Sequence, residues 1–279
     1  MKLSPCHILC AILLPVCALS ALAQLEVLPQ DAVPMVFCGE ARRLQVLFCN
    51  PSDQDVTVPL STKLLQASSA TTMPVGDAQL WKPLRVLAGQ TIVESVTLNF
   101  PAVKTGTRFI VQWLDNRGKQ VGTIDVVVQP PDLLKGLQPL LSEKPLGVFD
   151  PENQLKPLLK SAKQEHDDLE ETGWESFSGK LVLVGPFAGR KQMPGSLDDK
   201  IKTLAQRGVG VVWMQPPSLR HAKLETSDYL VRRGAGSVVV ATAKSVAGLA
   251  QDPAAQLNLL RLARLAAKAE PPDLPPLKP

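Results

Sequence analysis

The sequence predicts an all-β immunoglobulin-like sandwich followed by a small α/β domain of the doubly wound, flavodoxin-like type. Three observations lead to this fold class. Residues 25–130 are short runs of apolar and β-branched residues that alternate with turn signals and show no helical period. From residue 145 onward, continuous apolar runs alternate with amphipathic stretches, as in a parallel sheet with helical crossovers. The pair Pro130-Pro131 separates the two patterns.

The first 23 residues predict a signal peptide. Lys2 is followed by an uncharged apolar run that ends in small residues at Ala23, and cleavage is expected between Ala23 and Gln24. The run is too short to favour a membrane anchor. Lipidation is disfavoured because neither Cys10 nor Cys17 follows a small residue. A retained N-terminal helix is the alternative, but the expected mature chain is exported, periplasmic or extracellular, with no transmembrane segment.

In the sandwich half, turn signals separate pairs of strand-like runs. The turns are expected at 50–53, 88–90 and 115–118, and the last of them joins a hairpin. Trp81 and Trp113 lie within such runs, so both are expected in the core or at its edge. Strands at this spacing are typical of an immunoglobulin-like sandwich.

Cys38 and Cys49 are the two cysteines that remain after signal cleavage. An even pair in an exported protein is a candidate for a disulfide. Both lie in strand-like runs joined by a short turn, so a hairpin could bring them face to face in the right register. Two buried free thiols are the alternative.

The second half contains apolar runs and helical patterns in alternation. Hydrophobic residues make up 45% of the chain, enough for a core in each half. Ser196 and Asp252 are expected to cap two helices, the second with Pro253 at its first position. Strands are expected at 145–149, 167–171, 179–187, 209–214 and 236–242, and helices at 152–166, 196–207 and 252–269. The predicted segments are signal peptide 1–23, sandwich 24–130, linker with a short helix 131–144, α/β domain 145–269 and Pro-rich disordered tail 270–279.

The runs "LVLVGPF" (181–187) and "LAQRGVGVVWMQ" (204–215), with the order of strands and helices around them, resemble class I glutamine amidotransferase-like domains. The resemblance implies a nucleophilic Cys on a sharp elbow directly after the strand at 209–214, with a His and a Glu later. This sequence has no Cys there. Pro216 and Pro217 also oppose the strained backbone of an elbow, because proline fixes φ near −65° and restricts the preceding residue. The resemblance therefore implies a degenerate binding module without a nucleophile.

Ligands of such sheets bind beyond the carboxyl ends of the strands. The residues expected there, and the candidate ligand-binding residues, are Asp150, Gly185, Phe187 and Gln215. No catalytic residue is assigned, and His221 is expected on a solvated segment.

No cofactor, metal or nucleic acid is expected. The mature chain's histidines, at 166 and 221, lie far from its two cysteines, so no metal-ligand spacing appears. The glycines form neither a P-loop nor a dinucleotide motif. A net charge of +4, with Lys and Arg spread along the chain, is too weak for a nucleic-acid footprint.

The order of sandwich, linker and α/β unit resembles exported two-domain proteins of bacteria, which implies a location but no activity. The first hypothesis is a non-catalytic envelope protein that binds or scaffolds another envelope protein. The alternative is a hydrolase or transferase acting on envelope carbohydrate or peptide, with an interdomain site around Asp150, Phe187 and Gln215. A third is an accessory subunit of a membrane-bound complex. The oligomeric state is left open.

Overall fold

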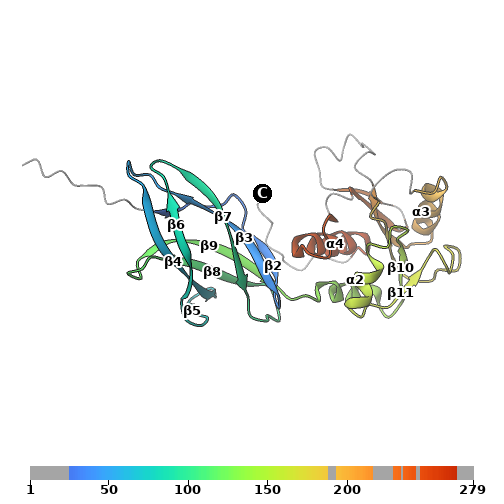
Figure 1. Ribbon diagram of the computed structural model, residues 1–279. Coiled ribbons are helices and arrows are strands. Elements are labelled where there is room, and N and C mark those ends of the chain that lie inside the picture. Colours follow the sequence, from blue (N-terminus) through green and yellow to red (C-terminus); the bar gives the residue numbers. More distant parts are fainter. Residues whose placement is uncertain (1–24, 188–192, 216–228, 234, 243–245, 269–279) are drawn as a thin grey trace, which may run out of the picture.

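The computed structural model shows two bodies joined end to end by a short connection after residue 129 (Figure 1). The predicted signal peptide, the Pro-rich tail, Pro216, Pro217 and His221 lie outside the residues that the structure describes. The described residues are 25–187, 193–215, 229–233, 235–242 and 246–268.

The first body consists of two sheets around one core. One sheet has the order β1-β3-β7, and the other has the order β2-β9-β8-β4, with β5 and β6 both pairing with β4. Alternate residues of each strand face inward, and Phe48 packs between Trp81 and Trp113 at centroid distances of 5.8 Å. Trp113 is fully buried in this core and Trp81 is partly buried against it, so the expected core or edge positions are confirmed. The strands are β1 (Glu26–Val27), β2 (Met35–Phe37), β3 (Ala41–Cys49), β4 (Val56–Ala67), β5 (Thr72–Pro74), β6 (Gln79–Val86), β7 (Thr91–Asn99), β8 (Thr107–Leu114) and β9 (Gln120–Gln129).

The two cysteines do not face each other. β2 pairs with β9, whereas β3 pairs with β1 and β7, so the expected hairpin between Cys38 and Cys49 does not form. Cys38 is buried, Cys49 is partly exposed, and both are free thiols. The reason is topological, since the short turn after Cys38 carries the chain from one sheet to the other.

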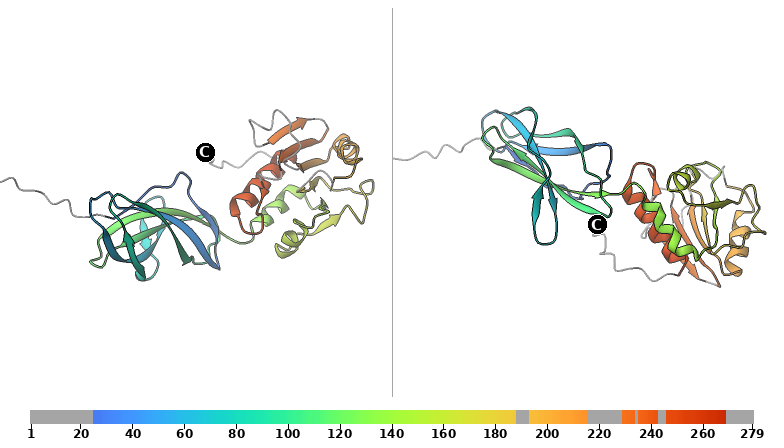
Figure 2. Two further views of the ribbon diagram at one scale, coloured as in Figure 1. Left: turned by 45° about the horizontal axis from the view of Figure 1, so that its top comes forward. Right: turned by 90° about the horizontal axis from the view of Figure 1, so that it is seen from below.

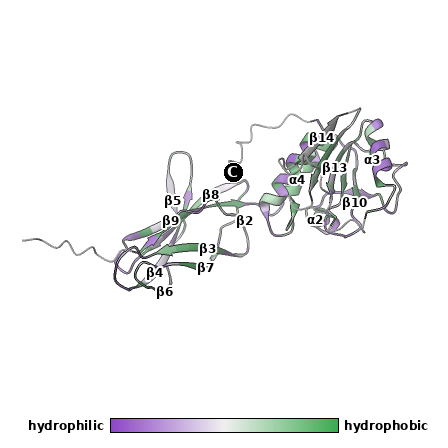
Figure 3. Ribbon diagram, turned by 90° about the horizontal axis from the view of Figure 1, so that it is seen from above, coloured by the Kyte–Doolittle hydropathy of each residue, from purple (hydrophilic) through white to green (hydrophobic). Residues whose placement is uncertain are grey.

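The second body is one six-stranded sheet with helices on its faces. Its order is β11-β10-β12-β13-β15-β14. Figure 3 shows the apolar strands between α4 on one side and α3, with its hydrophilic outer surface, on the other. The 3-10 helix η1 and α1 pack beside α4, as Figure 2 also shows. The elements are η1 (Leu133–Leu137), α1 (Gln138–Leu141), β10 (Leu146–Phe149), α2 (Lys156–Ser161), β11 (His166–Asp168), β12 (Leu181–Val184), α3 (Leu197–Gln206), β13 (Gly210–Gln215), β14 (Tyr229–Arg233), β15 (Ser237–Thr242) and α4 (Pro253–Ala266).

The expected fold class is wrong as stated, because both large sheets are mixed. In the first body β2 runs parallel to β9, which an antiparallel immunoglobulin-like sandwich does not contain. In the second body β14 is antiparallel to β15. Helices are also few: within the described residues, only α3 and α4 are longer than six residues. Beside α3, an irregular segment with Leu169, Trp174 and Phe177 covers the face that a doubly wound domain would cover with helices.

Several individual elements agree with the sequence expectations and others do not. The Asp252 side chain accepts a hydrogen bond from the Ala254 N–H at 2.8 Å, which confirms the predicted cap of α4. The helix expected at 152–166 is limited to the six residues of α2. Ser196 precedes α3 but makes no side-chain cap hydrogen bond.

Candidate functional site

The carboxyl ends of β10, β12 and β13 lie close together at Gly185. Its N–H donates to the Phe149 carbonyl at 2.9 Å, and the Phe187 N–H donates to the Met214 carbonyl at 3.4 Å. Gly185 has φ 88°, and a Cβ atom there would lie 2.7 Å from the Met214 oxygen. Only glycine fits this position, because both the positive φ and the close approach exclude a side chain. Gly185 therefore has a packing role in the described structure.

Aromatic rings pack near the ends of β10 and β12, where the strand order changes direction, in the core between the sheet and α3. Phe187 is fully buried, and its ring centroid lies 6.3 Å from that of Phe149. The Phe149 ring lies 5.1 Å from that of Trp174. Sheets of this type bind ligands beyond the strand ends at such a switch point. The three rings belong to the core cluster that also contains Ile201 and Leu204 of α3.

The Asp150 carboxylate forms hydrogen bonds with backbone N–H groups. It is 1% exposed and accepts hydrogen bonds from the N–H groups of Gln154 (3.0 Å), Leu155 (2.6 Å) and Lys156 (3.0 Å). These are donors of the turn that begins α2, which would otherwise have no intrahelical partner. Asp150 thus shapes the chain after β10, and its oxygens point toward α2.

Gln215 is the one predicted site residue with unused hydrogen-bonding capacity. It is 2% exposed at the end of β13, beside Thr242 in the β13–β15 register. Its Oε1 has no hydrogen-bond partner among the described residues. The structure therefore brings Gly185, Phe187 and Gln215 to the same edge of the sheet, while the carboxylate of Asp150 turns toward α2. Within the described residues, no three His, Cys, Asp or Glu side chains are grouped to hold a metal.

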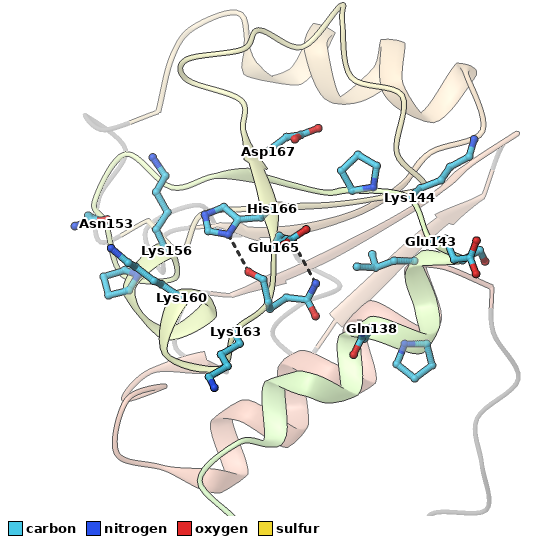
Figure 4. Close-up of a pocket in the computed structure, with 16 residues that line it drawn as sticks. Gln138, Glu143, Lys144, Asn153, Lys156, Lys160, Lys163, Glu165, His166 and Asp167 are labelled. Carbon is cyan, nitrogen blue, oxygen red and sulfur yellow. Dashed lines mark hydrogen bonds between the residues drawn. The ribbon is translucent and has the colours of Figure 1, made fainter.

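A different feature, absent from the sequence expectations, is an open groove of about 1560 Å³ along the free edge of β11 (Figure 4). One wall is α1 with the turn that leads to β10. The other wall is α2, and the floor is β11 with the residues just before it. Lysines of the α2 wall, at 156, 160 and 163, lie on one side of the groove, and Glu143 and Lys144 lie on the other.

Lys156 ties the α2 wall to β11. Its ammonium forms ion pairs with Asp168 and Glu170. Burial works to lower the pKa of Lys156, but the hydrogen bonds to both carboxylates outweigh it and raise that pKa. Burial likewise works to raise the pKa of Asp168, while Lys156 and the Glu170 N–H lower it below its usual value. Both groups are therefore held in their charged forms.

Unusual backbone conformations are concentrated around this groove. Of the five described non-glycine residues with positive φ, four line it: Ser142, Glu143, Asn153 and Lys163, with φ between 49° and 64°. The left-handed conformation costs a non-glycine residue about 1–2 kcal/mol. Such residues cluster at functional sites. No sequence signal marks these positions, because glycine, the usual residue there, is missing.

No protein-family model matches the chain, and no curated protein matches it. Similar solved structures include a β-glucosidase from Listeria innocua in complex with glucose, with 15% identity and a TM-score of 0.29 over 39% of this chain. They also include an alkylpurine DNA glycosylase from Pseudomonas fluorescens bound to DNA (15%, 0.28, 38% of this chain and 31% of that chain) and a Niemann-Pick type C2 protein from Japanese carpenter ant (11%, 0.26, 34% and 79%). The chain spans 16% of the length of that β-glucosidase. At these TM-scores the likenesses establish neither a shared fold nor an activity.

None of the helices in the described part of the chain combines the length and the apolar character needed to cross a bilayer.

Proposed function

We propose that this chain is an exported, non-catalytic protein of the cell envelope that binds another protein. The observation that supports this most directly is the packing at the carboxyl ends of the strands. Phe149, Trp174 and Phe187, beside the switch point, have buried rings in the core that faces α3, so these rings are not presented to a substrate.

The chemistry of the same edge also favours binding over catalysis. A hydrolase or transferase needs a group there that can transfer a proton. Asp150, the ionisable residue among the predicted ligand-binding residues, instead accepts hydrogen bonds from three backbone N–H groups. Gln215, with its unpartnered Oε1, can accept a hydrogen bond but has no proton-transfer chemistry at neutral pH.

The test is affinity purification of the full chain, with a C-terminal tag, from gently extracted bacterial envelopes. We expect a partner protein in a fixed ratio to the chain, and no release of soluble fragments from envelope carbohydrate or peptide. The matched control is the same tagged chain lacking residues 2–23, the predicted signal peptide, which should stay in the cytoplasm and capture no envelope partner. Failure of the wild-type chain to retain any partner, or release of fragments by it, would overturn the proposal.

A further inference from the structure

The free edge of β11 lies within the groove and offers unpaired backbone groups. Among the described strands, β11 pairs with β10 alone, in parallel, and the Leu169 N–H donates to the Val148 carbonyl at 2.9 Å. In a parallel ladder, alternate residues bond to the same neighbour. The register therefore directs the backbone N–H and C=O groups of Asp167 and Leu169 toward β10. The N–H and C=O of His166 and the N–H of Asp168 point away from β10.

The two faces of this edge differ in charge. Asp168 forms an ion pair with Lys156, so His166 and Asp168 face α2, where Lys160 and Lys163 also lie. Successive side chains of a strand point to opposite faces. Asp167 therefore faces the other side of the sheet, and Glu165, two residues earlier, follows the same alternation. On the α2 face, Lys160 and Lys163 lie beside the ion pairs of Lys156 with Asp168 and Glu170, and the opposite face carries Glu165 and Asp167, with Lys144 on the far wall of the groove.

We propose that this groove binds an extended peptide segment of a partner protein, which adds to β11 as a further strand and carries alternating acidic and basic side chains. Acidic side chains of the peptide meet Lys160 and Lys163, and the basic ones between them meet Glu165 and Asp167. Backbone hydrogen bonds to the edge supply affinity and the alternating charges supply the register, as in other cases of strand addition. This inference rests on the proposed function, since it names the surface that the partner contacts.

A charged, short edge strand can also serve only to prevent unwanted pairing. Two features set this edge apart. Walls on both sides, α1 with its turn and α2, flank the edge in an open groove of about 1560 Å³. Four residues in the left-handed conformation, all lining the groove, maintain its shape at a cost to stability.

The test is fluorescence anisotropy of the full chain with a labelled synthetic peptide of about 12 residues of alternating Glu and Lys, at about 0.15 M salt. We expect it to bind about tenfold more tightly than the same peptide with N-methyl groups on alternate residues, which cannot donate to the edge. It should also bind several-fold more tightly than a peptide of equal composition with Glu and Lys in blocks of two. Equal binding of all three peptides would overturn the proposal.

Charge-reversed variants test the surface itself. The double variant Lys160→Glu/Lys163→Glu should weaken binding of the alternating peptide by about three- to tenfold. Lys104→Glu/Lys119→Glu changes the net charge equally but lies in the first body, so it should leave binding unchanged. Circular dichroism checks that both variants are folded. Unchanged binding by the first variant would contradict the proposed surface.

The two proposals can fail separately. If the Lys160→Glu/Lys163→Glu chain captures the same envelope partner as the wild type, the groove inference fails and the proposed function stands. If the wild-type chain binds the alternating peptide but retains no envelope partner, the proposed function fails.

Discussion

Asn50 holds the turn between β3 and β4 through both ends of its side-chain amide. It is fully buried, and its Nδ2 donates to the carbonyls of Gln54 (2.7 Å), Val86 (3.2 Å) and Leu87 (3.2 Å). Its Oδ1 accepts from the N–H and hydroxyl of Ser52. One side chain thus connects two turns that lie more than thirty residues apart in the sequence.

Asn50→Ala should destabilise the first body by about 1–3 kcal/mol, because the buried Val86 carbonyl and two partly buried carbonyls lose their donor. The measurement is urea denaturation followed by tryptophan fluorescence. Asn116→Ala is the matched control, since Asn116 is exposed in the turn between β8 and β9 and should change stability by less than about 0.5 kcal/mol. A similar loss in both variants would show that the buried amide has no special role.

At the scale of the element, α2 ends without the usual glycine. Lys163, the second residue after the helix, has φ 55°, and the Gln164 N–H closes the helix end by donating to the Leu159 carbonyl at 2.9 Å. Glycine adopts this conformation without steric cost. We therefore expect Lys163→Gly to stabilise the second body by about 1 kcal/mol.

The matched control for Lys163→Gly lies three residues earlier. Lys160 is within α2, where glycine is unfavourable, so Lys160→Gly should destabilise by about 1 kcal/mol. Urea denaturation of both variants measures the two effects. The same sign of change in both would contradict the assigned backbone conformation of Lys163.

The ion pairs of Lys156 should make the second body sensitive to acid. The folded-state pKa of Asp168 is below its unfolded value of about 3.9, so its contribution is present above about pH 4 and is lost as pH falls through the folded pKa. The pKa of Lys156 is raised, so its contribution is present below about pH 10 and is lost only as pH rises through the raised value. At neutral pH both contributions are complete.

Asp168→Asn should therefore lower the free energy of unfolding at pH 7 and reduce its further loss between pH 5 and pH 3. The measurement is urea denaturation of both chains at several pH values. Wild-type and variant curves that remain parallel down to pH 3 would contradict the role of Asp168. Glu171→Gln is the control, because Glu171 is exposed and forms no ion pair with Lys156.

The sequence predicted most strands but not how they pair. Apolar runs such as 181–184 and 210–215 are buried on both faces, so their composition alone identifies them. The same composition fits a parallel or an antiparallel neighbour, which is why β14 and its antiparallel pairing were missed. Local signals around the short turn after Cys38 predict a hairpin. The two strands that flank this turn, β2 and β3, instead pair with distant strands and belong to different sheets.

The candidate site was predictable only in part. The carboxyl ends of parallel strands meet at one edge of a sheet, and Gly185, Phe187 and Gln215 lie together at that edge, as expected. Burial and hydrogen bonding decide what those residues do, and neither can be read from the chain. The groove beside β11 depends on walls about twenty residues apart in sequence and on the backbone conformation of Lys163, which have no local signature.

At the scale of the whole molecule, the two bodies have separate cores. The core of the first body lies between Leu25 and Val128, and the two clusters of the second lie between Leu134 and Ala266, with no residue in common. η1 packs on α4, and α4 contacts β2, so the described contact between the bodies is small. Domains with separate cores and a small junction unfold independently.

We therefore expect two thermal transitions in calorimetry of the full chain, each responding to its own variants. Asn50→Ala should lower one midpoint by several degrees and leave the other in place. Asp150→Ala, which removes the acceptor of three buried or partly buried N–H groups, should lower only the other midpoint. A shift of both midpoints by either variant would mean that the junction couples the two bodies, so that a ligand in the groove of the second body would also stabilise the first.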